Sequence, residues 1–261
     1  MPDDLRGQLV VTPGSSVRLA EHDPAATFGY EKETAKAKVA ADLERLASVQ
    51  DRLWAERKRR VLIILQGIDA SGKDGMIKHV MSAFHPLGCR LTSFGVPSAV
   101  ELAHDYLWRI HQAVPADGEI AIFNRSHYEN VLVVRVHSLA PPAVWSQRYD
   151  QINAFERMLG EEGTTVLKFF LHIDRDEQLE RLKARYDDPT KRWKFQLGDL
   201  EDRKRWDDYM AAYQDTLFDH PRAVVHRPCQ SQMVPRSGHR RDRGRHTGGA
   251  EAGVSRSPRS T

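Results

Sequence analysis

Residues 61–75, which read VLIILQGIDASGKDG, constrain the fold more than any other stretch of the chain. Their apolar start, residues 61–65, predicts a buried strand of a parallel sheet. Residues 67–73 then match G-x-x-x-x-G-K, the pattern of a phosphate-binding loop, and a helix is predicted from about residue 74 to 84. Glycines let backbone N–H groups turn toward phosphate oxygens, and the positive end of the helix points at the same place. The stretch therefore predicts an α/β fold that binds phosphate where the strand ends.

Single residues of this loop have separate predicted roles. Lys73 places a positive charge within reach of the phosphates that are transferred. The next residue is usually Ser or Thr, whose hydroxyl binds magnesium, but here it is Asp74, so Asp69 becomes the natural metal ligand. A chance match is the alternative, and the predicted strand before it and helix after it argue against that. The residues predicted to bind phosphate here are Gly67, Ala70, Ser71, Gly72, Lys73, Asp74, Gly75 and Lys78.

The composition restricts where the protein works and what it binds. No apolar run is long enough to span a membrane, and no secretory signal opens the chain. The two cysteines do not make a disulfide framework, so a cytoplasmic location is predicted. The net charge is +3, but residues 219–261 hold nine arginines and three acidic residues, which leaves the body slightly acidic. We therefore expect one large domain with no membrane and no nucleic acid as partner.

The remaining pattern alternates strands with helices. Residues 1–29 are polar and broken by prolines, and they predict an extended arm. Further strands are predicted over 90–94, 119–123 and 165–173, and helices over 32–59, 98–114, 145–159, 176–186 and 199–218. Polar residues 124–130 follow the strand 119–123, at the sheet edge where ligands bind in open α/β folds. We expect these residues to face the phosphate-binding loop.

A cluster of cations surrounds the sequence Asp188-Pro189, where a helix must break. It consists of Arg181, Lys183, Arg185, Lys191, Arg192 and Lys194. In nucleotide kinases a basic flap of this kind closes over the phosphates and excludes water. The alternative is an ordinary charged surface helix.

Three blocks together resemble the polyphosphate kinase 2 family: GIDASGKDG at 67–75, FNRSHYENVLVVRVH at 123–137 and RYDDPTKRWK at 185–194. The resemblance covers about residues 17–217 and implies a three-layer P-loop kinase-like α/β fold with a central parallel sheet and a helical lid over about 181–198. It also implies phosphoryl transfer from inorganic polyphosphate to nucleoside mono- and diphosphates, AMP and ADP, with Mg²⁺ or Mn²⁺. A dimer or tetramer of identical chains is expected.

The resemblance also assigns roles to single residues. It makes Asp69, Lys73, Arg125 and Glu129 catalytic, with Asp69 as the metal ligand. It places Arg181, Arg185, Lys191 and Lys194 along the polyphosphate, and Asn124, Arg125, Glu129, Asn130 and Arg135 at the nucleotide acceptor. One departure matters, because the family motif usually continues Glu-Asp where this chain has Glu129-Asn130. The missing carboxylate is expected to weaken magnesium or acceptor binding.

Residues 219–261 differ from the rest of the chain. They contain no Leu, Ile, Phe, Tyr, Trp or Lys, and this composition predicts disorder. A reading one nucleotide later, with permissible synonymous codons, resembles the strand and closing helix of the family. Our hypothesis is a frameshift near residues 217–219, and the alternative is a natural basic tail that binds nucleic acid or polyphosphate. The predicted organisation is thus an arm (1–29), a kinase domain (30–218) and an Arg-rich tail (219–261).

Two other functions remain open on the sequence. One is an ordinary ATP-dependent nucleotide kinase, and the other is a P-loop nucleotide-binding regulator without turnover. The density of cations in the lid favours polyphosphate as the donor, because a nucleotide donor needs fewer cations.

Overall fold

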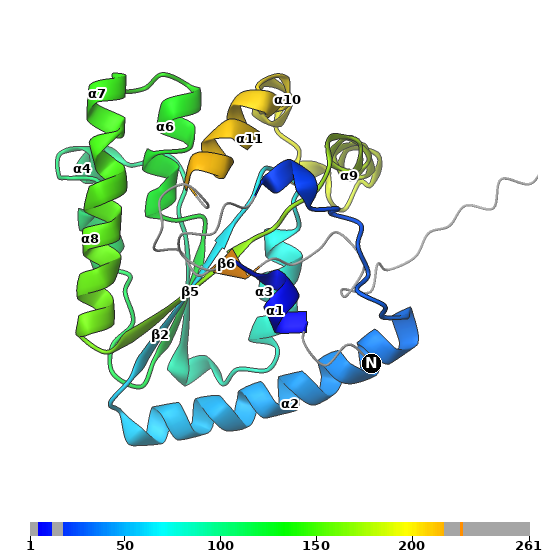
Figure 1. Ribbon diagram of the computed structural model, residues 1–261, viewed down its shortest axis with the longest axis vertical. Helices are drawn as coiled ribbons and strands as arrows, with labels where there is room; N and C mark the ends of the chain where they lie inside the picture. Colours follow the sequence, from blue (N-terminus) through cyan, green and yellow to red (C-terminus); the bar gives the residue numbers. More distant parts are fainter. Residues whose placement is uncertain (1–4, 12–17, 217–224, 227–261) are drawn as a thin grey trace, which may run out of the picture.

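The computed structural model describes residues 5–11, 18–216 and 225–226. Its centre is a six-stranded sheet in the order β1-β6-β5-β2-β4-β3 (Figure 1). The strands are β1 Val10–Val11, β2 Arg60–Gln66, β3 Cys89–Ser93, β4 Ile120–Asn124, β5 Thr164–Phe170 and β6 Val225–His226. All neighbours pair in parallel except β1, which runs antiparallel to β6. The predicted parallel sheet with the loop strand at its centre is confirmed.

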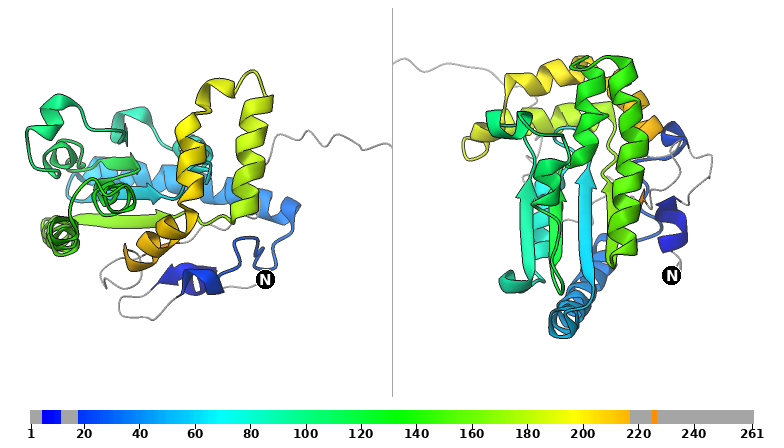
Figure 2. Two further views of the ribbon diagram at one scale, coloured as in Figure 1. Left: turned by 90° about the horizontal axis from the view of Figure 1, so that it is seen from above. Right: turned by 90° about the vertical axis from the view of Figure 1, so that its left-hand side faces the viewer.

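Helices cover both faces of this sheet (Figure 2). The longer ones are α2 Lys32–Glu56, α3 Lys73–Met81, α8 Gln147–Glu161, α9 Arg175–Asp187, α10 Leu197–Lys204 and α11 Trp206–Gln214. The short ones are α1 Leu5–Leu9, α4 Ala99–Leu102, α5 Trp108–His111, α6 Val133–Val136 and α7 Pro142–Trp145. Single 3₁₀ turns are η1 Leu19–Glu21, η2 Pro86–Gly88, η3 His127–Asn130 and η4 Arg192–Lys194.

The alternation of side chains along β2 divides the core into two layers. Leu62 and Ile64 pack in one cluster with α8 and α11 residues such as Ile152 and Tyr209. Leu65 faces the other side, in a cluster with Ile77 of α3 and Leu53 of α2. Because successive strand residues point to opposite faces, one apolar strand serves both layers. The chain therefore has the predicted three-layer P-loop kinase-like α/β fold.

The carboxyl ends of the strands point toward α6, α9 and α10, which gather at one end of the molecule (Figure 2). The predicted lid consists of the end of α9, the turn η4 and the start of α10. This arrangement brings the lid to the same edge of the sheet as the phosphate-binding loop. No helix of the part that the structure describes combines the length and apolar character needed to cross a membrane.

Two predicted helices are broken. The helix expected over 98–114 begins with the predicted capping box of Ser98 and Glu101, but α4 ends at Leu102. The carboxylate of Asp105 accepts a hydrogen bond from the backbone N–H of Leu107, and this turn separates α4 from α5. The helix expected over 199–218 is likewise divided into α10 and α11, and at the break the guanidinium of Arg205 donates to the carbonyl of Val136.

The two ends of the chain differ from expectation as well. The arm is not simply extended, because it contains α1, β1 and η1, and Val11 and Leu19 are buried in the core. The tail was predicted to be disordered, and this is wrong for residues 225–226, whose backbone joins β5 and β1 as β6. The frameshift hypothesis and the rest of residues 219–261 lie outside the described residues.

Candidate active site

The phosphate-binding loop joins β2 to α3 in a conformation that requires glycine. Gly67 has a φ of +155°, and a Cβ there would lie 2.6 Å from Ser71 Oγ and 2.8 Å from the carbonyl oxygen of Leu171. Gly72 has a φ of +106°, a backbone angle that residues other than glycine rarely adopt. The local sequence therefore curls the backbone as the motif predicts, with Lys73 at the first position of the helix.

Lys73 is folded back into its own loop. Its Nζ donates to the carbonyl oxygens of Gly67 at 2.6 Å and Ile68 at 3.2 Å, and the residue is only 8% exposed. Burial lowers the pKa of Lys73 to about 8, against the opposing attraction of Asp69. A lysine held in this way offers its charge to an arriving phosphate, which replaces the carbonyl partners.

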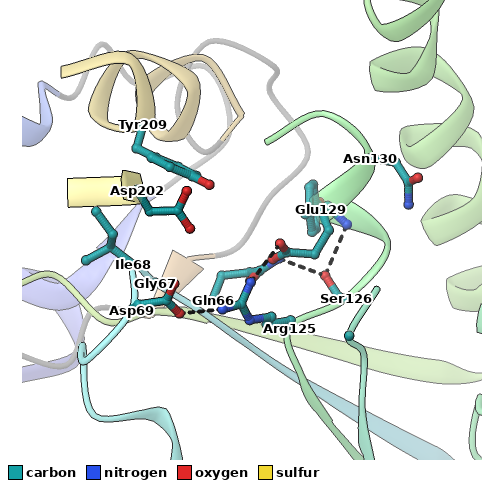
Figure 3. Close-up of polar contacts among 12 residues, drawn as sticks. Gln66, Gly67, Ile68, Asp69, Arg125, Ser126, Glu129, Asn130, Asp202 and Tyr209 are labelled. Carbon is teal, nitrogen blue, oxygen red and sulfur yellow. Dashed lines mark hydrogen bonds and ion pairs between the residues drawn. The ribbon is translucent and has the colours of Figure 1, made fainter. Parts of the chain in front are cut away.

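Arg125 joins the two carboxylates that are predicted to be catalytic, those of Asp69 and Glu129. It follows β4 with a φ of +62°, and its guanidinium donates to Asp69 and, at 3.3 Å, to Glu129 (Figure 3). Asp69 comes from the loop after β2 and Glu129 from η3, so the contact exists because the two strands are neighbours. Lys73 is coupled electrostatically to all three residues. The structure thus brings the four predicted catalytic residues together.

Asp74 has a different partner from the one its position suggests. Its carboxylate accepts a hydrogen bond from Asn124 Nδ2 at 3.2 Å and from Lys194 Nζ of the lid at 2.7 Å. The hydrogen bond from Lys194 lowers the pKa of Asp74 below its usual value. Where related loops use a hydroxyl, this chain has a carboxylate that holds the lid.

The four lid cations that the resemblance places along polyphosphate, Arg181, Arg185, Lys191 and Lys194, all have protein partners. Arg181 donates to the carbonyl oxygens of Ala70 at 3.1 Å and Ser71 at 2.8 Å, so it supports the loop from behind. Arg185 lies 3.7 Å from the carboxylate of Asp199. Lys191 pairs with Asp188 at 2.7 Å on the exposed surface. A polyphosphate bound by these cations would have to replace their protein partners, and Arg181 has three such hydrogen bonds.

Two predicted acceptor residues lie apart from this group. The amide of Asn130 donates to the carbonyl of His127, and Figure 3 shows it away from Asp69 and Arg125. Arg135 of α6 binds Asp215 and lies 5.0 Å from the centre of the Trp145 ring. Their assigned role stays a prediction.

Sequence reasoning missed the acidic residues that α10 contributes. Asp202 and Tyr209 face the space beside Asp69 and Glu129 (Figure 3), and His137 Nε2 lies 2.8 Å from Asp202 Oδ1. Burial, and then repulsion from Asp69, raises the pKa of Asp199. No local pattern marks these residues, because α10 meets the loop only in the folded chain.

A divalent cation fits this site only with help from substrate. Among the described residues, no group of three or more His, Cys, Asp or Glu side chains has the arrangement of a metal site. Mg²⁺ commonly binds one or two carboxylates and completes its shell with phosphate oxygens and water. The partly exposed carboxylate of Asp69, beside the phosphate-binding loop, suits that mode.

Known proteins resemble this chain over most of its length. The family model described as Polyphosphate kinase 2 (PPK2) matches residues 29–226. The AMP/ADP-polyphosphate phosphotransferase of Meiothermus ruber is 54% identical over 209 residues, which cover 79% of this chain and 78% of that protein. The ADP-polyphosphate phosphotransferase of Rhodopseudomonas palustris is 44% identical over 225 residues, covering 81% of this chain and 78% of that protein. The crystal structure of Polyphosphate Kinase 2 from Arthrobacter aurescens TC1 superposes with a TM-score of 0.82 at 45% identity, over 87% of this chain and 83% of that one.

Proposed function

This chain belongs to the polyphosphate kinase 2 family, and on that premise we propose that it transfers phosphoryl groups from inorganic polyphosphate to AMP and ADP. The observation that carries the proposal is the junction of Asp69, Arg125 and Glu129 beside Lys73, at the mouth of the phosphate-binding loop. Two cations and two carboxylates are thus preorganised at the place where we propose that the phosphoryl group passes from donor to acceptor.

The chemistry needs positioning and charge neutralisation more than a strong base. The acceptor phosphate attacks in its deprotonated form, so no side chain has to remove a proton. Lys73, which is buried, and Arg125, which is partly buried, neutralise charge that develops on the transferred group. Mg²⁺, or Mn²⁺ in its place, would be held by Asp69 and would supply further charge neutralisation to the transferred group.

Donor and acceptor approach from different elements. Arg185, Lys191 and Lys194 of the lid are placed to follow a polyphosphate chain, whose negative charges exchange for their carboxylate partners. Asn124, Arg125 and Glu129, at the end of β4 and on η3, are placed to hold the acceptor nucleotide. The named relatives that act on AMP/ADP and on ADP support both nucleotides as acceptors.

The deciding experiment uses AMP, Mg²⁺ and long-chain polyphosphate without any nucleoside triphosphate. Formation of ADP and then ATP is the expected result. An ATP-dependent kinase would produce nothing until ATP is added, and a regulator would bind nucleotide with no turnover under either condition. A cytoplasmic location and a dimeric or tetrameric assembly belong to the same proposal, and cell fractionation and light scattering test them.

A further inference from the structure

A buried ion pair lies beneath the turn that carries Arg125 and Glu129. Lys168 of β5 donates from Nζ to Glu156 Oε2 of α8 at 2.5 Å. The side chains are 5% and 7% exposed, so neither is available to a substrate. The catalytic site described above makes no use of this pair, and buried charges need an explanation.

Both residues of the pair reach the catalytic turn from below. Tyr128 Oη donates to Glu156 Oε1 at 2.8 Å and accepts from Lys168 Nζ at 2.9 Å. His127 Nε2 lies 3.2 Å from the same Glu156 oxygen, and His127 is fully buried. His127 and Tyr128 stand between Arg125 and Glu129 in the sequence, so the pair binds the middle of the turn whose ends hold the catalytic side chains.

The start of the turn is tied to the phosphate-binding strand. Ser126 Oγ accepts from Gln66 Nε2 at 3.2 Å and from the backbone N–H of Tyr128 at 3.2 Å. Arg125 itself donates its backbone N–H to Leu65 of β2 at 3.0 Å. Every residue between Arg125 and Glu129 therefore has a buried polar partner, and the turn has little freedom to rotate.

Stability alone does not account for the pair. Replacing a buried ion pair by apolar residues of similar volume is often neutral or stabilising, because the two charges lose their hydration. Burial raises the pKa of Glu156, but the attraction of Lys168 and His127 outweighs it and brings the pKa to about 2. Glu156 is therefore a carboxylate at neutral pH, and hydrogen bonds to a charged acceptor are shorter and stronger than those between neutral groups.

We propose that Lys168 and Glu156 are positioning residues, which act through Tyr128 and His127 to fix Arg125 and Glu129 relative to the phosphate-binding loop. This inference rests on the proposed roles of Arg125 and Glu129 in phosphoryl transfer. The roles themselves are tested first, because loss of polyphosphate-dependent turnover in Arg125→Ala supports them whatever the ion pair does.

The main variant is Lys168→Met with Glu156→Leu, which removes both charges together and leaves no uncompensated ion. We expect kcat to fall by about 10- to 100-fold, as for a small displacement of a catalytic group, while the KM for AMP and polyphosphate changes little. A second double variant, Lys168→Met with Glu156→Gln, keeps a hydrogen-bonding partner for Tyr128. Its kcat should therefore be higher than that of the main variant. If the charge-free variant does not fold, Tyr128→Phe is tested in its place, because it leaves the ion pair intact. It too should lower kcat with little change in KM.

The matched control is Gln50→Ala. Gln50 is 2% exposed, and its amide binds the backbone of His85 in both directions, far from the site in the α2 layer. This variant should lose stability and keep kcat when both proteins are assayed well below their melting temperatures. A similar fall in kcat for Gln50→Ala would mean that loss of stability alone explains the result for the ion-pair variant, and it would overturn the proposal.

A double-mutant cycle separates positioning from structure. In the Glu129→Gln background, Tyr128→Phe should cost less than it does in the wild type, because one of the two groups that it positions is already lost. Additive losses would refute the proposal, and so would an unchanged kcat in a folded charge-free variant. A wild-type protein with no polyphosphate-dependent activity would instead refute the proposed function.

Discussion

Lys194 donates a 2.7 Å hydrogen bond to Asp74 across 120 residues of sequence, and this contact joins the lid to the first turn of α3. The ion pair is partly exposed, with 34% and 58% of the two side chains accessible. Asp74 therefore connects the lid to the loop, and we expect a bound polyphosphate chain to compete with it for Lys194. This competition leads to the first prediction.

Asp74→Asn should raise the apparent affinity for polyphosphate. Since partly exposed ion pairs contribute about 0.2–1 kcal/mol, freeing Lys194 should lower the KM for polyphosphate by up to about fivefold. The KM for AMP is measured as the internal reference and should stay constant. A higher KM for polyphosphate would mean that the Asp74 carboxylate orders the loop instead of competing with the donor.

Two lid variants, Arg185→Ala and Lys194→Ala, should weaken the binding of polyphosphate more than the binding of the acceptor nucleotide. The reason is that the long donor contacts several lid cations at once. The loss should shrink at high salt, since exposed charges are screened. Lys204→Ala is the matched control, because Lys204 is 70% exposed and its ion pair is with neighbouring Glu201. An unchanged KM for polyphosphate in both lid variants would place the donor elsewhere.

Lys73→Ala and Asp69→Ala should each lose most turnover while the protein remains folded. Neither side chain belongs to the apolar core, and each faces the phosphate-binding loop. Removal of one preorganised charge at a transferring phosphoryl group costs about 3 kcal/mol or more of transition-state stabilisation. Steady-state rates beside circular dichroism spectra check this, and near-wild-type rates would exclude the assigned roles.

The rate at low substrate should depend on the protonation of Lys73. Burial lowers the pKa of this lysine to about 8, so the free enzyme loses the charge as pH rises through that value. The parameter kcat/KM reports the free enzyme and should decline above about pH 8, whereas bound phosphates favour the charged form and should preserve kcat to higher pH. Lys73→Arg should show no such decline, because a guanidinium stays protonated. A flat wild-type profile up to about pH 10 would contradict the buried-lysine argument.

The frameshift hypothesis predicts that the chain as written is poorly soluble or weakly active. A sheet without the closing helix that the resemblance implies leaves apolar surface uncovered. Each Leu or Ile side chain that is no longer buried lowers the free energy of unfolding by about 1.5–3 kcal/mol. Restoring the frame near residues 217–219 should rescue both yield and activity. Resequencing of the gene, with expression of both forms, tests the idea, and a stable, fully active chain with the frame confirmed as written would refute it.

The sequence by itself determined the parts of the site that depend on local pattern. The glycine spacing around residues 67–73 dictates the loop, because only certain residues adopt its backbone angles. An apolar run followed by Asn124 and Arg125 places those residues at the carboxyl edge of a parallel sheet. The basic residues around Asp188-Pro189 predicted the lid from local sequence as well, because a proline ends a helix at the residues next to it.

Only the tertiary structure decided which charged groups meet. Lys194 reaches Asp74, Arg181 supports the loop carbonyls, and Lys168 finds Glu156, all through packing that no local pattern encodes. The breaks at Asp105 and Arg205 also follow from contacts outside the predicted helices or from turns that compete with them. The depressed pKa of Lys73 belongs to this class as well, because desolvation exists only when distant segments close around a side chain.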